Sequence, residues 1–137
     1  MRDPEGLLDT SAVLALPRLA DGLALPEVSM ICSVTLAELA LGPLLAADDV
    51  QRARRQAQVQ QAEADFDPLP FDAAAARAFA RVAASLRGAG RKPSARSFDA
   101  MIAAIAIANG LPLYTANPAD FAGIDDLVVR PIPAPRT

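Results

Sequence analysis

The segment Leu7-Leu8-Asp9-Thr10-Ser11-Ala12 joins an apolar pair directly to an acid and two hydroxyl residues. The leucines predict a short buried strand, and Thr10 or Ser11 can cap a helix that continues over residues 12–16. A strand that runs at once into a helix begins a β-α unit, and sheets built from such units bind ligands at the carboxyl ends of their strands. Asp9 therefore stands where a functional site is expected.

The rest of the chain alternates in the same way. Apolar runs predict strands at 28–32, 113–114 and 127–129, with a brief extended piece at 68–70. Helices are expected at 35–45, at 51–65, from a cap at Asp72 to the glycines at 88 and 90, and from Ser97 or Asp99 to 109–110. The proline-rich tail, 131–135, is expected to lie outside the sheet. This order predicts a single α/β domain, residues 1–137, with a parallel sheet covered by helices on both faces.

Composition removes several kinds of chemistry. The 137 residues are 53% hydrophobic, enough for one core, and include no histidine. Serine–histidine and cysteine–histidine nucleophiles, imidazole bases and the usual zinc sites are thereby excluded. The lone Cys32 lies in an apolar run, where a buried structural role is favoured over a catalytic thiol. Carboxylates remain the strongest candidates for catalysis.

The chain lacks the features of an exported or membrane protein. The first five residues include the acids Asp3 and Glu5, where a signal peptide would have a basic flank. The longest apolar run, 100–108, is shorter than the ~18 residues of a membrane helix. We expect a cytoplasmic protein without a membrane segment. The formal charge is -3, but no acid occurs between Asp72 and Asp99, a stretch with six basic residues, so one side of the molecule is expected to be positive.

Four acids lie at the ends or starts of apolar segments: Asp9, Glu38, Asp99 and Asp120. Carboxylates brought together in a partly buried place repel one another, and oxygen-only clusters suit hard ions such as Mg²⁺ or Mn²⁺. The hypothesis is a metal-dependent site for phosphodiester chemistry.

Each of these acids also has a purely structural interpretation. Asp9 could cap the first helix, Glu38 could close a capping box with Thr35, Asp99 could stabilise a helix dipole, and Asp120 could be a solvated turn residue. The pair Asp125-Asp126 is an alternative to Asp120. Arg77 and Arg81, one helical turn apart, form either a solvated helix face or, with Arg96, a surface for phosphate or a partner.

Four strings, in order along nearly the whole chain, carry a family resemblance: Leu8-Asp9-Thr10-Ser11-Ala12, Glu38-Leu39, Phe98-Asp99-Ala100-Met101-Ile102-Ala103-Ala104 and Leu113-Tyr114-Thr115-Ala116-Asn117-Pro118-Ala119-Asp120-Phe121. The chain resembles PIN-domain ribonucleases, specifically the VapC toxins of type II toxin–antitoxin systems. The resemblance implies a five-stranded parallel sheet of order 3-2-1-4-5. It also implies that the four acids are catalytic and bind Mg²⁺ or Mn²⁺, with Asn117 and the hydroxyl of Thr10 or Ser11 as polar support.

The same resemblance implies an activity and partners. The expected reaction is cleavage of structured RNA, tRNA or rRNA, by metal-activated water, leaving 5′-phosphate and 3′-hydroxyl ends. A VapB antitoxin and a toxin homodimer are the implied partners, and the apolar helix at 35–45 either lies under the antitoxin or packs in the core. Ala116 stands where many relatives have a basic residue, which affects local RNA contacts. The alternative function is a catalytically inactive PIN-like module that binds RNA or a partner.

Two other classes that place an acid at a strand end fit the sequence poorly. A receiver-like phospho-acceptor would want a lysine late in the sheet, and Lys92 is the only lysine. A haloacid-dehalogenase-type phosphatase would want a second acid at the position of Ser11.

Overall fold

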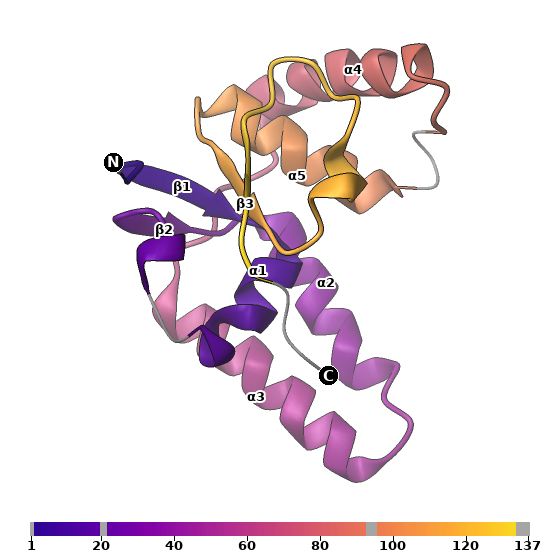
Figure 1. Cartoon of the computed structure of the whole chain (residues 1–137). Coiled ribbons are helices and arrows are strands. Elements are labelled where there is room, and N and C mark those ends of the chain that lie inside the picture. The colour runs from indigo at the N-terminus through magenta and orange to yellow at the C-terminus, as the bar shows by residue number, and fades with distance from the viewer. Residues whose placement is uncertain (1, 20–21, 93–95, 134–137) are drawn as a thin grey trace.

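A parallel sheet of four strands lies between helices in the computed structural model, which describes residues 2–19, 22–92 and 96–133 (Figure 1). The strands are β1 (Glu5–Leu8), β2 (Val28–Met30), β3 (Leu113–Thr115) and β4 (Val129–Pro131). Their order across the sheet is β2-β1-β3-β4, and every pair is parallel. The predicted α/β class with a parallel sheet is confirmed.

The prediction of five strands is corrected to four, because the expected third strand is reduced to one bridge. Leu69 pairs with Cys32 beyond the end of β2, where its amide donates to the Ile31 carbonyl at 2.9 Å and its carbonyl accepts from the Ser33 amide at 2.8 Å. Prolines precede and follow Leu69, and a proline has no N–H to extend a ladder. The bridge nevertheless occupies the edge that the order 3-2-1-4-5 assigns to the third strand.

The last strand begins later than predicted and includes a proline that we had placed outside the sheet. β4 covers Val129–Pro131 rather than residues 127–129. The next amide, that of Ile132, donates to the Thr115 carbonyl at 2.9 Å. Alternate amides of an edge strand point away from the sheet, so the missing N–H of Pro131 costs no hydrogen bond to β3.

The predicted helices are all present: α1 (Thr10–Ala15), α2 (Ser33–Leu44), α3 (Asp49–Asp65), α4 (Ala73–Gly88) and α5 (Ser97–Ala108). Short 3-10 turns, η1 (Leu16–Arg18), η2 (Gly22–Ala24) and η4 (Pro118–Phe121), occupy the connections. The cap of α1 is Asp9 rather than Thr10 or Ser11, and α2 and α3 each begin two residues earlier than predicted. Asp72 caps α4 as expected, accepting from the Ala75 amide at 2.9 Å.

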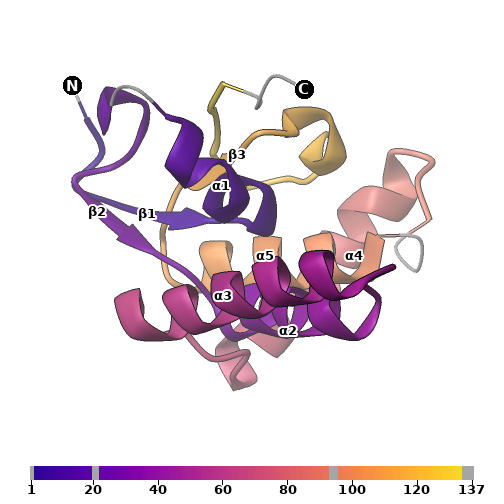
Figure 2. The same cartoon turned by 90° about the horizontal axis from the view of Figure 1, so that it is seen from below.

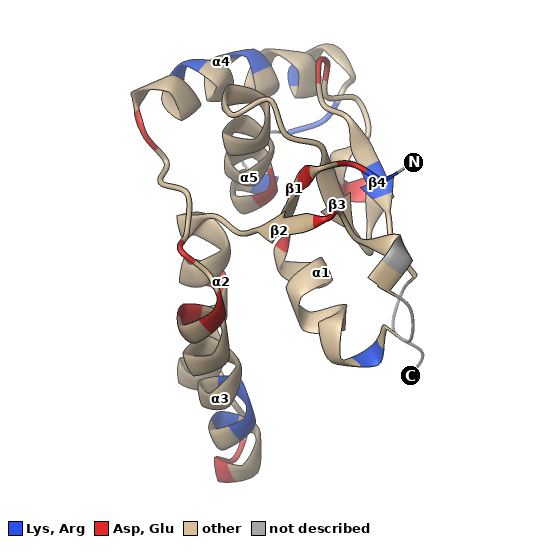
Figure 3. Cartoon of the chain, turned by 90° about the vertical axis from the view of Figure 1, so that its left-hand side faces the viewer, with Lys and Arg blue, Asp and Glu red and all other residues tan. Residues whose placement is uncertain are grey.

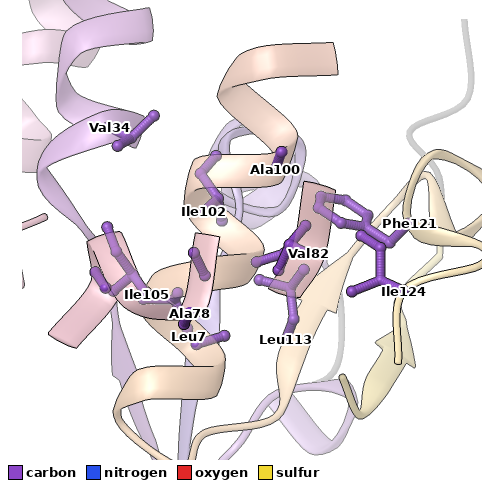
Figure 4. Close-up of a cluster of buried hydrophobic side chains, with 14 of the residues drawn as sticks. Leu7, Val34, Ala78, Val82, Ala100, Ile102, Ile105, Leu113, Phe121 and Ile124 are labelled. Carbon is purple, nitrogen blue, oxygen red and sulfur yellow. The ribbon is translucent and has the colours of Figure 1, made fainter. Parts of the chain in front are cut away.

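Leu7 and Leu8 point to opposite faces of the sheet and belong to two separate cores. The Leu7 core packs against α4 and α5, with Val82, Ile105 and Leu113 at its centre (Figure 4). The Leu8 core packs against α1, α2 and α3. Figure 1 shows α4 and α5 on one side of the sheet and the other three helices on the other. Burial of each large apolar side chain contributes about 2 kcal/mol, so both faces fix the strand ends that carry the acids.

Helices α2 and α3 pair with each other and extend away from the sheet as an arm (Figures 1 and 2). Leu44, Leu45 and Val50, at the turn between these two helices, are 70 to 79% exposed. Among the described residues, no helix is both long and apolar enough to cross a membrane.

Gly6 makes room for the side chains of Tyr114 and Pro26. A Cβ at this position would lie 2.5 Å from Cε1 of Tyr114 and 2.9 Å from Cγ of Pro26. Glycine is therefore required where the tyrosine ring crosses the strand. The pairing of β1 with β3 places Leu8 opposite Tyr114, and the Asp9 amide donates to the Tyr114 carbonyl at 3.0 Å.

Candidate active site

Asp9 follows β1 directly and is held by three donors. Its Oδ1 accepts hydrogen bonds from the Ala12 amide at 2.8 Å and the Ser11 hydroxyl at 2.7 Å, and its Oδ2 accepts from the Thr115 hydroxyl at 2.5 Å. The side chain is buried, and this burial raises its pKa against the opposing effect of the three hydrogen bonds. Asp9 thus caps α1 and is also fixed at the sheet edge where a site was expected.

The hydroxyls around Asp9 form a network that joins the two central strands. Ser11 Oγ and Thr115 Oγ1 lie 3.2 Å apart, and each also accepts a backbone amide at 3.0 Å, from Ala116 and Asn117 respectively. Asn117 enters this network through its backbone. Thr115 is fully buried and was not among the predicted site residues. The sequence signal that pointed to Asp9, a polar residue directly after apolar strand residues, also applies to Thr115.

Glu38 lies on α2 and accepts a hydrogen bond from the Thr10 hydroxyl at 2.7 Å. Both hydroxyl residues after Asp9 therefore support an acid, Ser11 on Asp9 and Thr10 on Glu38. Burial raises the pKa of Glu38, the hydrogen bond opposes it, and the charge of Asp9 adds to the increase. The capping-box interpretation is wrong, because α2 begins at Ser33 and Thr35 is buried inside the helix.

Asp99 and Asp120 approach the same region from α5 and η4. Burial raises the pKa of Asp99 to about 6, and the negative charges of Asp120, Glu38 and Asp9 add to the increase. The guanidinium of Arg96 opposes it: its Nη1 lies 3.6 Å from Asp99 Oδ2 and 2.9 Å from Asp120 Oδ1. All four predicted acids therefore share one electrostatic neighbourhood.

The connection between α4 and α5 also holds the backbone that carries Asp120. Nη1 of Arg91 donates to the Ala122 carbonyl at 2.5 Å and lies 3.4 Å from the Ala119 carbonyl. These carbonyls belong to η4 and the residue that follows it. Arg91 thus fixes the turn in which Asp120 lies.

The acids fit a hard divalent ion by their chemistry, although they do not form a closed cage. Across residues 2–19, 22–92 and 96–133, no three histidine, cysteine or acidic side chains converge tightly enough to hold a metal. The donors are carboxylate oxygens, which Mg²⁺ and Mn²⁺ prefer. Arg96 pairs with both Asp99 and Asp120, so one positive charge of the chain already lies beside these two acids.

The remaining predicted residues lie elsewhere. Asp125 and Asp126 line a cavity of about 640 Å³ with Arg81 and Ser85, so the acid beside Asp99 is Asp120. Arg77 and Arg81 are exposed on α4, one of the elements that carry basic side chains in Figure 3. A role for these two arginines in contacting RNA or a partner stays a prediction.

Comparison with known proteins gives consistent matches. Residues 7–127 match the family model described as the PIN domain. Ribonuclease VapC5 of Mycobacterium tuberculosis is 40% identical over 122 residues, which cover 88% of this chain and 87% of that protein. Ribonuclease VapC8 of the same organism is 38% identical over 101 residues, 74% of this chain and 89% of that protein. The crystal structure of VapBC-5 from M. tuberculosis, a member of the VapBC family of toxin-antitoxin systems, aligns with a TM-score of 0.79 and 34% identity over 94% of this chain and 99% of the other.

Proposed function

The chain belongs to the PIN-domain family, and on that basis we propose that it is the toxin of a type II toxin–antitoxin system, a metal-dependent endoribonuclease that cleaves structured RNA. The observation that carries the proposal is the gathering of four acids from four separate segments into one electrostatic neighbourhood. The named VapC ribonucleases that it resembles support the same activity.

Asp9, Asp99 and Asp120 are the proposed ligands of Mg²⁺ or Mn²⁺, with Glu38 binding directly or through water. Burial and nearby negative charge make the ionised forms of Asp9, Glu38 and Asp99 costly, and a bound cation would remove that cost. When bound, such an ion lowers the pKa of water and neutralises charge on the phosphate.

The chain's own residues orient the site. Ser11 and Thr115 fix both oxygens of Asp9, and Thr10 fixes Glu38, so these two carboxylates need no rearrangement when substrate arrives. Glu38, with its raised pKa, is the candidate for exchanging a proton with water near the scissile phosphate. The expected products carry 5′-phosphate and 3′-hydroxyl ends, and tRNA or rRNA is the expected substrate class.

A VapB-type antitoxin and a second copy of the toxin are the proposed partners. Support for an antitoxin comes from the VapBC-5 structure, which belongs to a toxin–antitoxin system. The exposed apolar side chains at the end of the arm, Leu44, Leu45 and Val50, are available to a protein partner.

The test is cleavage of total RNA by the antitoxin-free protein in Mg²⁺, Mn²⁺ or EDTA, with sequencing of new 5′ ends. Asp120→Asn is expected to lose cleavage, whereas the matched control Asp125→Asn, in the same segment but on the separate cavity, is expected to retain it. Discrete cuts that need metal and Asp120 would support the nuclease. Absence of cuts, with metal binding intact, would favour a PIN-like module that binds without cleaving.

A further inference from the structure

The guanidinium of Arg96 lies between two acids of the proposed metal site. Its Nη1 is 2.9 Å from Asp120 Oδ1 and 3.6 Å from Asp99 Oδ2. The two acids come from different elements, η4 and the first turn of α5. One positive charge of the chain therefore bridges two carboxylates that would otherwise only repel each other.

Asp99 and Asp120 are paired with a charged group, Arg96, whereas Asp9 and Glu38 are not. Asp9 and Glu38 are held by hydroxyl and amide donors, which are neutral. The charge of Asp120 raises the pKa of Asp99, and the charge of Arg96 lowers it. Without a bound metal, Arg96 supplies the positive charge that a pair of close carboxylates requires.

Three features favour displacement of the Arg96 guanidinium by a metal ion. The Arg96 side chain is 46% exposed, so water screens its ion pairs and weakens them. The residue precedes α5, and its long unbranched side chain can turn away without movement of the helix. A divalent ion carries twice the charge and binds carboxylate oxygens directly.

We propose that Arg96 is the internal counter-cation of the site, which pairs with Asp99 and Asp120 in the metal-free protein and is displaced when a divalent ion binds. This inference rests on the proposed function.

The direct test follows the Nε–Hε signals of the arginines by NMR while Mg²⁺ is added to the full-length protein. Arg96→Lys identifies the Arg96 signal by its loss. This signal is expected to shift in step with Mg²⁺ binding measured by calorimetry. The signal of Arg130, which pairs with Asp3 outside the site, is the internal control and is expected to stay in place.

Affinity gives a second readout. Arg96→Gln removes the competitor and is expected to bind Mg²⁺ about two- to five-fold more tightly than wild type, while Arg96→Lys and the control Arg130→Gln remain close to wild type. Mg²⁺ binding to wild type with an unmoved Arg96 signal, or an Arg96→Gln variant that binds no more tightly, would overturn the inference and leave the nuclease proposal standing. Binding by Arg96→Gln alone would support the inference, and binding by neither protein would overturn both proposals.

Discussion

The four acids are held in two different ways on the two sides of the candidate site. Asp9 and Glu38, beside β1 and α2, are fixed by neutral hydroxyl and amide donors, and Asp9 is almost completely buried. Asp99 and Asp120, on α5 and η4, are partly exposed and are bridged by one arginine. The first side is preorganised by hydrogen bonds, and the second is balanced by a charge.

The Asp9 side of the proposed site is rigid, whereas the Asp99 side is the part expected to respond to a ligand. Neutral donors orient a carboxylate without competing for a cation, so they can stay in place when a metal binds. A guanidinium orients carboxylates by occupying the place of the cation, so it must leave. In the proposed site, the Asp9 side is expected to stay fixed when a metal binds, and the Asp99 side is expected to exchange Arg96 for the metal.

Loss of an acid on either side is expected to have the largest effect. Asp9→Asn and Asp99→Asn each remove one charge from the proposed metal site and are expected to lower kcat/KM for RNA cleavage about 100-fold or more. Circular dichroism is expected to show a folded protein in both cases. Full activity in either purified variant would contradict its assignment.

Removal of the Thr115 hydroxyl tests the Asp9 side of the site alone. Thr115→Val leaves Oδ2 of Asp9 without its donor and is expected to reduce activity about 10- to 100-fold and stability by about 1–3 kcal/mol. RNA-cleavage kinetics and urea unfolding measure the two effects. Thr115→Ser keeps the hydroxyl and is expected to restore activity, whereas failure of this rescue would show that Thr115 acts by packing alone.

The raised pKa of Asp99 predicts that the stability of the protein in EDTA depends on pH. Asp99 has a pKa of about 6 in the folded protein, above its ordinary 3.8, so between these values the folded state holds more protons than the unfolded state. Stability is therefore expected to fall as pH rises from about 4 to 6, by about 1 kcal/mol after allowance for solvent screening. Asp99→Asn is expected to reduce that fall; an unchanged pH profile of unfolding would argue against the raised pKa.

The smallest expected effect is that of Arg96 on stability. In EDTA at pH 7, Arg96→Gln is expected to lose up to about 1 kcal/mol, because Asp99 and Asp120 then repel each other without compensation. With saturating Mg²⁺ the two proteins are expected to become equally stable. A difference in stability between wild type and Arg96→Gln that persists in Mg²⁺ would mean that the guanidinium stays paired with Asp99 and Asp120.

Much of the fold could be predicted because its signals are local, whereas the grouping of the four acids was implied by the family resemblance and their metal-binding role stays a prediction. The strand-to-helix transition at Asp9 and the Asp72 cap are set by neighbouring residues, and the structure has both. The fifth strand failed because two prolines around Leu69 leave only a single bridge. The strand at β4 was misplaced because an edge strand tolerates Pro131 on its outer side.

The connections within the site could not be read from the sequence. Thr115 meets Asp9 across 106 positions, and Arg96 meets Asp120 only because the α4–α5 connection passes beside η4. The basic stretch predicted a surface for RNA or a partner. In the structure, Arg91 contacts the η4 carbonyls and Arg96 pairs with Asp99 and Asp120, while a role for the basic stretch in contacting RNA or a partner stays a prediction.

The most direct test of the account is a crystal structure of the antitoxin-free protein soaked in Mn²⁺, with the ion located by its anomalous scattering. A peak coordinated by Asp9, Asp99 and Asp120 is expected, with the Arg96 guanidinium moved away from Asp99 and Asp120. A Mn²⁺ peak beside Asp125 and Asp126, or no peak near Asp9 under conditions that support RNA cleavage, would contradict it.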